Sequence, residues 1–255
     1  MEDRNDAPRV ALVTGGSRGI GAATVERLAR DGWAVAFSYA SRADAAEALV
    51  ARVEAAGGRA LAVRADVAEE GDVLALFRAV DAAIGRLDAL VNNAGIVAPP
   101  VRVEDLDAAR LARMLAVNVT GSFLCAREAV RRMAPRHGGR GGSIVNVSSV
   151  AARLGSPNEY VDYAASKAAV DTMTLGLAKE VAADGIRVNA VRPGIIDTGI
   201  HASGGQPDRV ARVVGAGAIP MGRAGTAREI ADAIAWLLSD ATYCTGTLLD
   251  VTGGR

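Results

Sequence analysis

Thr14-Gly15-Gly16-Ser17-Arg18-Gly19-Ile20-Gly21 (TGGSRGIG) decides the fold, because of what stands on either side of it. It follows Arg9–Thr14 (RVALVT), an apolar run typical of a buried strand, and it opens Gly19–Arg30, which has the pattern of a helix. Such a turn needs glycine, since its backbone must bend tightly and approach a phosphate closely. The first amides of the helix are unpaired and carry partial positive charge. The context therefore predicts a dinucleotide-binding turn rather than a glycine-rich turn without a ligand.

The rest of the chain alternates short apolar runs with longer helical patterns. We predict further strands at Trp33–Tyr39, Ala60–Arg64, Ala89–Asn92, Gly142–Val147, Ile186–Val191 and Leu248–Val251, and helices at Ala43–Ala56, Glu69–Ile84, Leu106–Ala116, Val119–Ala134, Val161–Ala183 and Ala227–Leu238. Strands without in-and-out alternation are buried on both faces, which indicates a parallel sheet. We expect one doubly wound (Rossmann-like) α/β domain over residues 1–255, with about seven parallel strands flanked by helices. Ile195–Met221 is glycine-rich with a weak helical pattern, and a connection of that length favours a substrate lid.

Composition excludes several classes of function. The 29 basic and 29 acidic residues balance, so neither nucleic acid nor an anionic membrane is favoured as a partner. Cys125 and Cys244 form no metal spacing and no disulfide framework, and Met1–Pro8 has no apolar signal core. His137 and His201 match no metal spacing, and we expect both on the surface. These features favour a cytoplasmic protein without a metal site.

The TGxxxGxG spacing resembles that of the short-chain dehydrogenase/reductase family. The resemblance extends over nearly the whole chain, through Asn92-Asn93-Ala94-Gly95 (NNAG), Tyr163-Ala164-Ala165-Ser166-Lys167 (YxxxK) and Pro193-Gly194 with Thr198 (PGxxxT). It implies a homotetramer or a homodimer, and the helical segments Leu111–Ala134 and Val161–Ala183 would suit such self-association. It also implies that these residues bind the cofactor: Gly15, Ser17, Arg18, Gly19, Ile20, Gly21, Ser41, Arg42, Asp66, Val67, Asn93, Ala94, Gly95, Tyr163, Lys167, Pro193, Gly194, Ile196 and Thr198.

The end of the second strand bears on the choice between NADP(H) and NAD(H). Ser38–Arg42 contains no carboxylate to bind a ribose diol, and Asp44 falls in the next helix. Arg42 and Arg18 can instead supply guanidinium groups to a 2′-phosphate, unless both are ordinary surface residues. We therefore expect NADP(H) to be favoured over NAD(H). Asp66 could contact the adenine or cap the helix that follows it.

Tyr163 and Lys167 are four residues apart in a helix, so their side chains share one face. We expect the ammonium and the bound nicotinamide to lower the pKa of the phenol, so that Tyr163 exchanges a proton with the substrate oxygen. Only two lysines occur among the 29 basic residues, and one of them is Lys167. Tyr160 lacks such a partner, because Ala164 lies four residues on.

The resemblance assigns two further catalytic residues. A serine at the end of the fifth strand would hydrogen-bond the substrate oxygen. Ser149 fits, although it precedes Tyr163 by one residue more than the family pattern, which we interpret as an insertion around Gly155–Glu159. Ser148 is the alternative. Asn118 would hold a water in a proton path from the lysine, or else adjust a bend in its helix.

Together these features predict an NADP(H)-dependent oxidoreductase that moves a hydride between a nicotinamide and a carbonyl or secondary alcohol. A non-catalytic nucleotide-binding sensor on the same fold is the alternative, but such proteins typically lose the Tyr or the Lys. Enoyl reductases of this type separate these two residues more widely. Arg153–Asp162 and Ile195–Met221 should set substrate specificity, and their few charges favour a neutral or mildly polar carbonyl compound.

Overall fold

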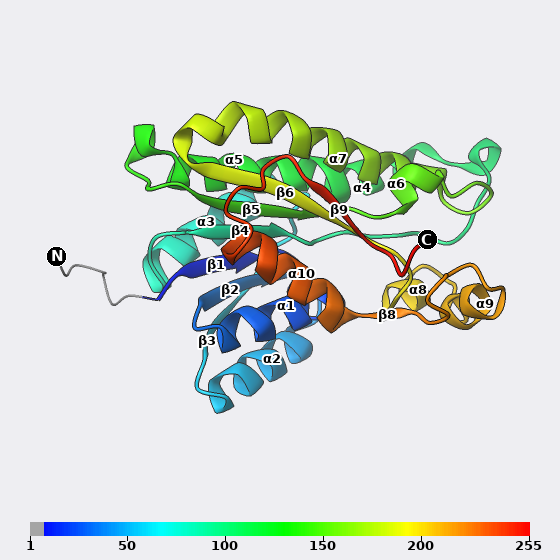
Figure 1. Cartoon of the computed structure of the whole chain (residues 1–255), viewed down its shortest axis with the longest axis horizontal. Helices are drawn as coiled ribbons and strands as arrows, with labels where there is room; N and C mark the ends of the chain where they lie inside the picture. The colour runs from blue at the N-terminus through cyan, green and yellow to red at the C-terminus, as the bar shows by residue number, and fades with distance from the viewer. Residues whose placement is uncertain (1–7) are drawn as a thin grey trace.

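Seven parallel strands form the central sheet of the computed structural model, which describes residues 8–255 (Figure 1). Their spatial order is β3-β2-β1-β4-β5-β6-β9. The bounds are β1 Val10–Val13, β2 Ala34–Tyr39, β3 Arg59–Arg64, β4 Ala89–Asn92, β5 Gly142–Val147, β6 Ile186–Pro193 and β9 Leu248–Val251. The order reverses between β1 and β4, and folds of this kind bind ligands in the crevice at such a switch point. The expected doubly wound architecture is confirmed, while the prediction for the first seven residues lies outside the described part.

Helices cover both faces of the sheet (Figure 1). One face carries α1 (Gly19–Arg30), α2 (Ala43–Ala55) and α10 (Ala227–Ser239), and the other carries α3 (Glu70–Ala83), α4 (Ala108–Leu115), α5 (Gly121–Met133) and α7 (Val161–Val181). Each face has its own buried apolar cluster, with Leu28, Leu49 and Ile234 in the first and Leu76, Met133 and Val181 in the second. All four residues of β1 are buried, because the strand lies between these two layers.

One long helical region differs from its prediction. Instead of two separate helices, α4 and α5 are joined without a break by a π-helical turn at Ala116–Thr120. A π turn adds a residue to the helical repeat and shifts the side chains that follow it, and it is frequent at functional sites. Asn118 lies within this turn and is fully buried.

The long connection after β6 folds into a small lobe beyond the end of the sheet (Figure 1). It consists of β7 (Ile196–Asp197), α8 (Ile200–Ser203), α9 (Arg209–Gly215) and β8 (Gly225–Thr226), and β7 pairs in parallel with β8. The weak sequence pattern did not predict these short elements, nor α6 (Ala151–Leu154) or the 3₁₀ turns at Val103–Asp105, Pro135–His137 and Ala182–Asp184. Short elements of this kind depend on tertiary contacts more than on their own propensity.

The glycine turn joins β1 to α1 with very little room. Gly19 has a φ of +54°, which favours glycine, and a Cβ atom on Gly21 would lie 2.4 Å from the carbonyl oxygen of Gly15 and 2.6 Å from Nδ2 of Asn93. The helix therefore starts directly against the ends of β1 and β4. No helix of residues 8–255 is both long and apolar enough to cross a bilayer.

Gly21→Ala should lower the free energy of unfolding by about 1–3 kcal/mol, because the added methyl group overpacks the turn. Gly71→Ala is the control: it lies exposed in α3, and a Cβ there would meet nothing within 4 Å. This control should gain up to about 1 kcal/mol of stability from its better helix propensity. Urea denaturation of both variants checks the expectation, and equal stability changes would contradict it.

Candidate active site

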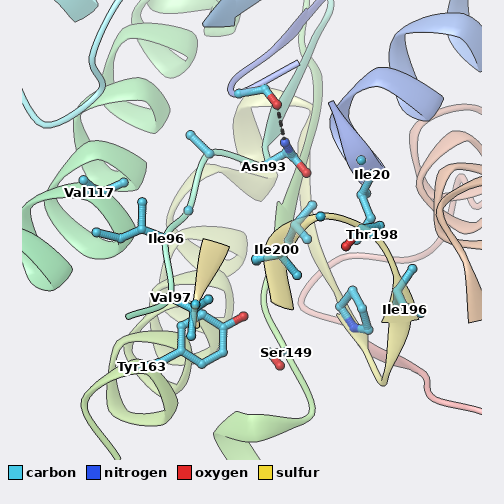
Figure 2. A pocket seen from close by; sticks show the side chains of 18 of the residues that line it. Ile20, Asn93, Ile96, Val97, Val117, Ser149, Tyr163, Ile196, Thr198 and Ile200 are labelled. Atoms are coloured by element: carbon cyan, nitrogen blue, oxygen red, sulfur yellow. Dashed lines mark hydrogen bonds between the residues drawn. The ribbon is translucent and has the colours of Figure 1, made fainter. Parts of the chain in front are cut away.

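A pocket at the carboxyl ends of the strands brings the predicted site residues together. All of them line it except Gly21 and Asn118, which lie behind its wall. Figure 2 shows Asn93 from the end of β4 and Ile20 from α1 in its upper part, Tyr163 and Ser149 in its lower part, and Thr198, Ile200 and Ile196 from the lobe between and beside them. Segments far apart in the chain therefore enclose one continuous pocket.

Asn93 locks the glycine turn to β4. Its Nδ2 donates to the carbonyl oxygens of Thr14 and Gly15, both at 2.9 Å, and Figure 2 marks a hydrogen bond from this side chain. In the other direction, the backbone N–H groups of Asn93 and Ala94 both donate to Oγ1 of Thr14 at 3.0 Å. On the other side of the turn, no side chain of the described residues caps α1. The first amides of α1 and the glycine backbone thus fit the pyrophosphate of a dinucleotide.

The two arginines expected near the 2′-phosphate differ in their surroundings. Both line the pocket, but Arg42 already makes a paired contact with Asp44, with Nε to Oδ1 at 3.0 Å and Nη2 to Oδ2 at 2.8 Å. This contact holds the pKa of Asp44 down at about 2. Arg18 is exposed and has no ion-pair partner among residues 8–255. Because an exposed ion pair contributes little, Arg42 can exchange Asp44 for a phosphate at small cost.

Asp66 closes a turn rather than capping a helix. Its Oδ1 accepts the N–H of Ala68 at 3.0 Å, but α3 begins at Glu70, later than expected, with Glu69 as its N-cap residue. Its Oδ2 accepts Nη2 of Arg113 at 2.8 Å. The helix-cap interpretation of Asp66 is therefore wrong. Arg113 lines the same part of the pocket, although no sequence pattern predicted it.

Tyr163 and Ser149 lie on the same wall of the pocket (Figure 2). Oγ of Ser149 accepts the N–H of Ala151 at 3.1 Å. Burial raises the pKa of Tyr163, while the Ser149 hydroxyl and the charge of Arg209 oppose that rise. Burial is the largest of these effects. At neutral pH the phenol is therefore protonated. The lowering that we expect from the ammonium together with a bound nicotinamide stays a prediction.

The lysine and Ser148 are tied to backbone groups. Nζ of Lys167 donates to the carbonyl oxygen of Val147 at 2.8 Å and lies 5.7 Å from the centre of the Tyr163 ring. Burial lowers the pKa of Lys167 to about 8, and Asp171 opposes this shift. Oγ of Ser148 donates to the carbonyl oxygen of Lys167 at 3.1 Å. Ser148 thus contacts the backbone of α7, while Ser149 is the serine that faces Tyr163.

Asn118 joins three segments behind the pocket. Its Oδ1 accepts the N–H of Ile96 at 2.8 Å, and its Nδ2 donates to the carbonyl oxygen of Ile96 and to Oγ of Ser166, both at 3.0 Å. The π turn directs this side chain toward the end of β4 and toward α7. A Cβ atom on Gly95 would lie 3.3 Å from Nζ of Lys167 and 3.4 Å from Oδ1 of Asn118, so the three residues lie in close contact.

Four side chains from the two predicted specificity segments, none of which was assigned a role in the site, complete the other end of the pocket: Tyr160, His201, Gln206 and Arg209. His201 is half-buried and its Nε2 lies 3.1 Å from the carbonyl oxygen of Ile196, so the expectation of a surface histidine is wrong. Burial lowers its pKa. Tyr160 packs edge-on against Tyr163, with ring centres 6.0 Å apart. Their places depend on how the lobe folds back, which no local spacing encodes.

The depressed pKa of Lys167 predicts a stability change with pH. Between about pH 8 and 10.5 the unfolded chain holds the lysine proton while the folded chain has released it, so stability rises with pH in this window. From pH 7.5 to 9.5, the free energy of unfolding of the wild type should rise by about 2 kcal/mol relative to that of Lys167→Met. Urea denaturation of both proteins at the two pH values measures this difference. Parallel pH profiles would contradict the assignment.

Comparison with known proteins identifies the family. A family model described as enoyl-(acyl carrier protein) reductase matches residues 15–255. The chain is 58% identical over 247 residues to the uncharacterized oxidoreductase YgfF of Escherichia coli (strain K12), covering 96% of this chain and 99% of that protein. It is 43% identical over 249 residues to cis-4-hydroxycyclohexanecarboxylate dehydrogenase of Sinomonas cyclohexanicum, covering 97% and 96%.

The fold comparison agrees. The structure of a short-chain dehydrogenase from Burkholderia cenocepacia J2315 in complex with NADP is 37% identical to this chain, with a TM-score of 0.88 and 99% coverage of both chains. The chain belongs to the short-chain dehydrogenase/reductase family, and it is an NAD(P)-dependent oxidoreductase that acts on hydroxyl or carbonyl groups.

Proposed function

We propose that the protein is an NADP(H)-dependent carbonyl reductase in which Tyr163 is the general acid. The observation that carries this proposal is that Tyr163, Ser149 and Lys167 line the same pocket as the glycine turn, with Nζ of Lys167 5.7 Å from the centre of the Tyr163 ring. A sensor that only binds nucleotide would not need a hydroxyl pair at this point of the pocket. The relative from Sinomonas cyclohexanicum is named for a hydroxyl-bearing substrate, which is consistent with carbonyl and alcohol chemistry here.

When bound, the nicotinamide supplies the hydride to the carbonyl carbon. Ser149 donates a hydrogen bond to the carbonyl oxygen, and Tyr163 transfers its phenolic proton to that oxygen as negative charge develops there. A protonated phenol at Tyr163 can act as the general acid that reduction requires. Lys167 would return a proton to Tyr163, and Asn118 would hold a water in the proton path that starts from the lysine.

The cofactor preference rests on charge. Arg18 is free to bind a 2′-phosphate, Arg42 can exchange Asp44 for it, and the end of β2 offers no carboxylate to repel it. The neighbour from Burkholderia cenocepacia was solved with NADP. Asp66 and Val67 would lie against the adenine at the same end of the pocket.

Three further proposals concern the whole molecule. Residues 195–221 act as a lid over the substrate end, since the lobe they form lines the pocket. The protein assembles as a homotetramer or a homodimer through α5 and α7, where Phe123 and Leu175 are exposed apolar residues. It works in the cytoplasm, which suits two unpaired cysteines.

The test compares wild type with Tyr163→Phe and Tyr160→Phe on ketones, aldehydes and an enoyl thioester, following NADPH and NADH oxidation. Tyr163→Phe should lose activity about a hundredfold or more, because the proton donor is removed. Tyr160→Phe keeps its ring beside Tyr163 and loses only its hydroxyl, so it should retain hydride transfer. Cofactor fluorescence titration should show unchanged NADPH binding by Tyr163→Phe. Tight NADPH binding without reduction of any carbonyl would instead favour a sensor, and activity confined to the thioester would favour an enoyl reductase.

A second pair of variants tests the cofactor preference. Arg18→Ala should raise KM for NADPH about tenfold or more and leave KM for NADH within about twofold, because one guanidinium–phosphate contact is lost. Arg42→Ala should show a smaller change in the same direction, since Asp44 competes for this side chain. Initial rates at varied cofactor concentration measure both constants. An equal loss with NADPH and NADH would show that the arginines bind a part that both cofactors share.

A further inference from the structure

A buried guanidinium lies in the wall of the substrate end of the pocket. Arg209 is the first residue of α9, lines the pocket and is only 7% exposed. Its Cζ lies 4.9 Å from the centre of the Tyr160 ring, and Tyr160 in turn packs against Tyr163. The charge of Arg209 also reaches Tyr163, whose pKa it lowers. Arg209 and the proposed proton donor therefore face the same space.

The surroundings of Arg209 hold it in place without fully neutralising it. Its Nη1 lies 2.6 Å from Oε2 of Glu159 and 3.5 Å from Oε1 of Gln206. Glu159 does not line the pocket, and its other oxygen lies 3.4 Å from Nη2 of the exposed Arg212. Two arginines thus share one carboxylate, which leaves a formal charge of +1 on the cluster. Because a buried charge without a full partner is costly, this arrangement favours an anion on the pocket side.

Unused donors remain on Arg209. Nε and Nη2 have no hydrogen-bond partner among residues 8–255, whereas Nη1 is anchored by Glu159. The planar face of the guanidinium is fixed by the Tyr160 ring, and Gln206 donates to the hydroxyl of that ring at 3.3 Å. A fixed guanidinium with free donors matches the two oxygens of a carboxylate.

No carboxylate side chain of residues 8–255 lines the substrate end of the pocket. Asp66 is the one acidic side chain among the described residues that line the pocket, and it lies at the cofactor end, where it accepts hydrogen bonds from Arg113 and from the N–H of Ala68. The substrate end is therefore positive.

We infer that Arg209 binds an acidic group of the substrate, and that the substrates are keto acids or hydroxy acids whose carboxylate lies away from the reacting carbon. This inference rests on the proposed carbonyl reduction at Tyr163. An acidic substrate differs from the neutral carbonyl compound that the sequences of Arg153–Asp162 and Ile195–Met221 favour. The difference arises because the fold brings Arg209, one of the few charged residues of these segments, into the pocket wall.

The experiment compares linear and cyclic keto acids with their methyl esters as substrates for wild type, Arg209→Gln and Arg212→Gln. Wild type should prefer each acid that fits over its ester by about tenfold or more in kcat/KM. Arg209→Gln should lower kcat/KM for the acids about ten- to a hundredfold and leave the esters within about threefold, since one contact to a charged group is lost. Arg212→Gln removes the other arginine bound to Glu159 but leaves the pocket wall unchanged, since Arg212 does not line the pocket. Because Arg212 is exposed and its charge is screened by solvent, this variant should keep the acid preference with a loss of no more than about threefold.

Other outcomes would overturn the inference. A wild type that prefers esters, or an Arg209→Gln variant that loses acids and esters alike, would make Arg209 a structural residue of the lobe. If wild type reduces no compound, carbonyl reduction fails as the proposed function, but the role of Arg209 is still decided by calorimetry with benzoate and hexanoate in the presence of NADP⁺. Binding to wild type and to Arg212→Gln but not to Arg209→Gln supports the anion site, and no binding to wild type refutes it.

Discussion

The contact between the glycine turn and the end of β4 is the constraint on which the rest of the structure depends. Thr14 and Asn93 exchange hydrogen bonds across the point where the strand order reverses, and Gly21 packs against both segments. Because this contact fixes the start of α1 relative to β4, it also fixes the distance between the phosphate-binding amides and the catalytic residues after β4 and β5. The apolar layers on both faces of the sheet hold this frame rigid.

The proposed catalytic groups belong to a buried polar network next to the contact between the glycine turn and β4. Asn118 ties Ile96 to Ser166 of α7, and Lys167 and Ser148 tie α7 to the end of β5. Each of these polar atoms has a partner, as burial requires. The same burial moves two pKa values in opposite directions, since it disfavours both the phenolate of Tyr163 and the ammonium of Lys167. Burial therefore favours the neutral form of both side chains.

Charge is distributed along the pocket to suit anionic ligands. The net charge of the chain is zero, but in the described part of the chain the charged side chains that line the pocket are mostly cationic: Arg18, Arg42, Arg113, Lys167, Arg209 and Arg255, against the one carboxylate side chain, that of Asp66. A cleft lined by one sign of charge concentrates ligands of the opposite sign. The cations at one end suit the phosphates of the dinucleotide, and Arg209 places a separate positive charge at the other end.

The sequence by itself determined the fold class, most helix and strand boundaries and the order of the motifs, because periodicity and turn chemistry are local properties of the chain. The resemblance of these motifs to the short-chain dehydrogenase/reductase family pointed to Gly15, Asn93, Tyr163 and Lys167. Only the tertiary structure decided which of Ser148 and Ser149 faces Tyr163, and that burial raises the pKa of Tyr163. It also decided that His201 and Arg209 line the pocket. The places of these last two residues depend on how the lobe after β6 folds against the pocket, and contacts between residues so distant in the chain leave no pattern in its sequence.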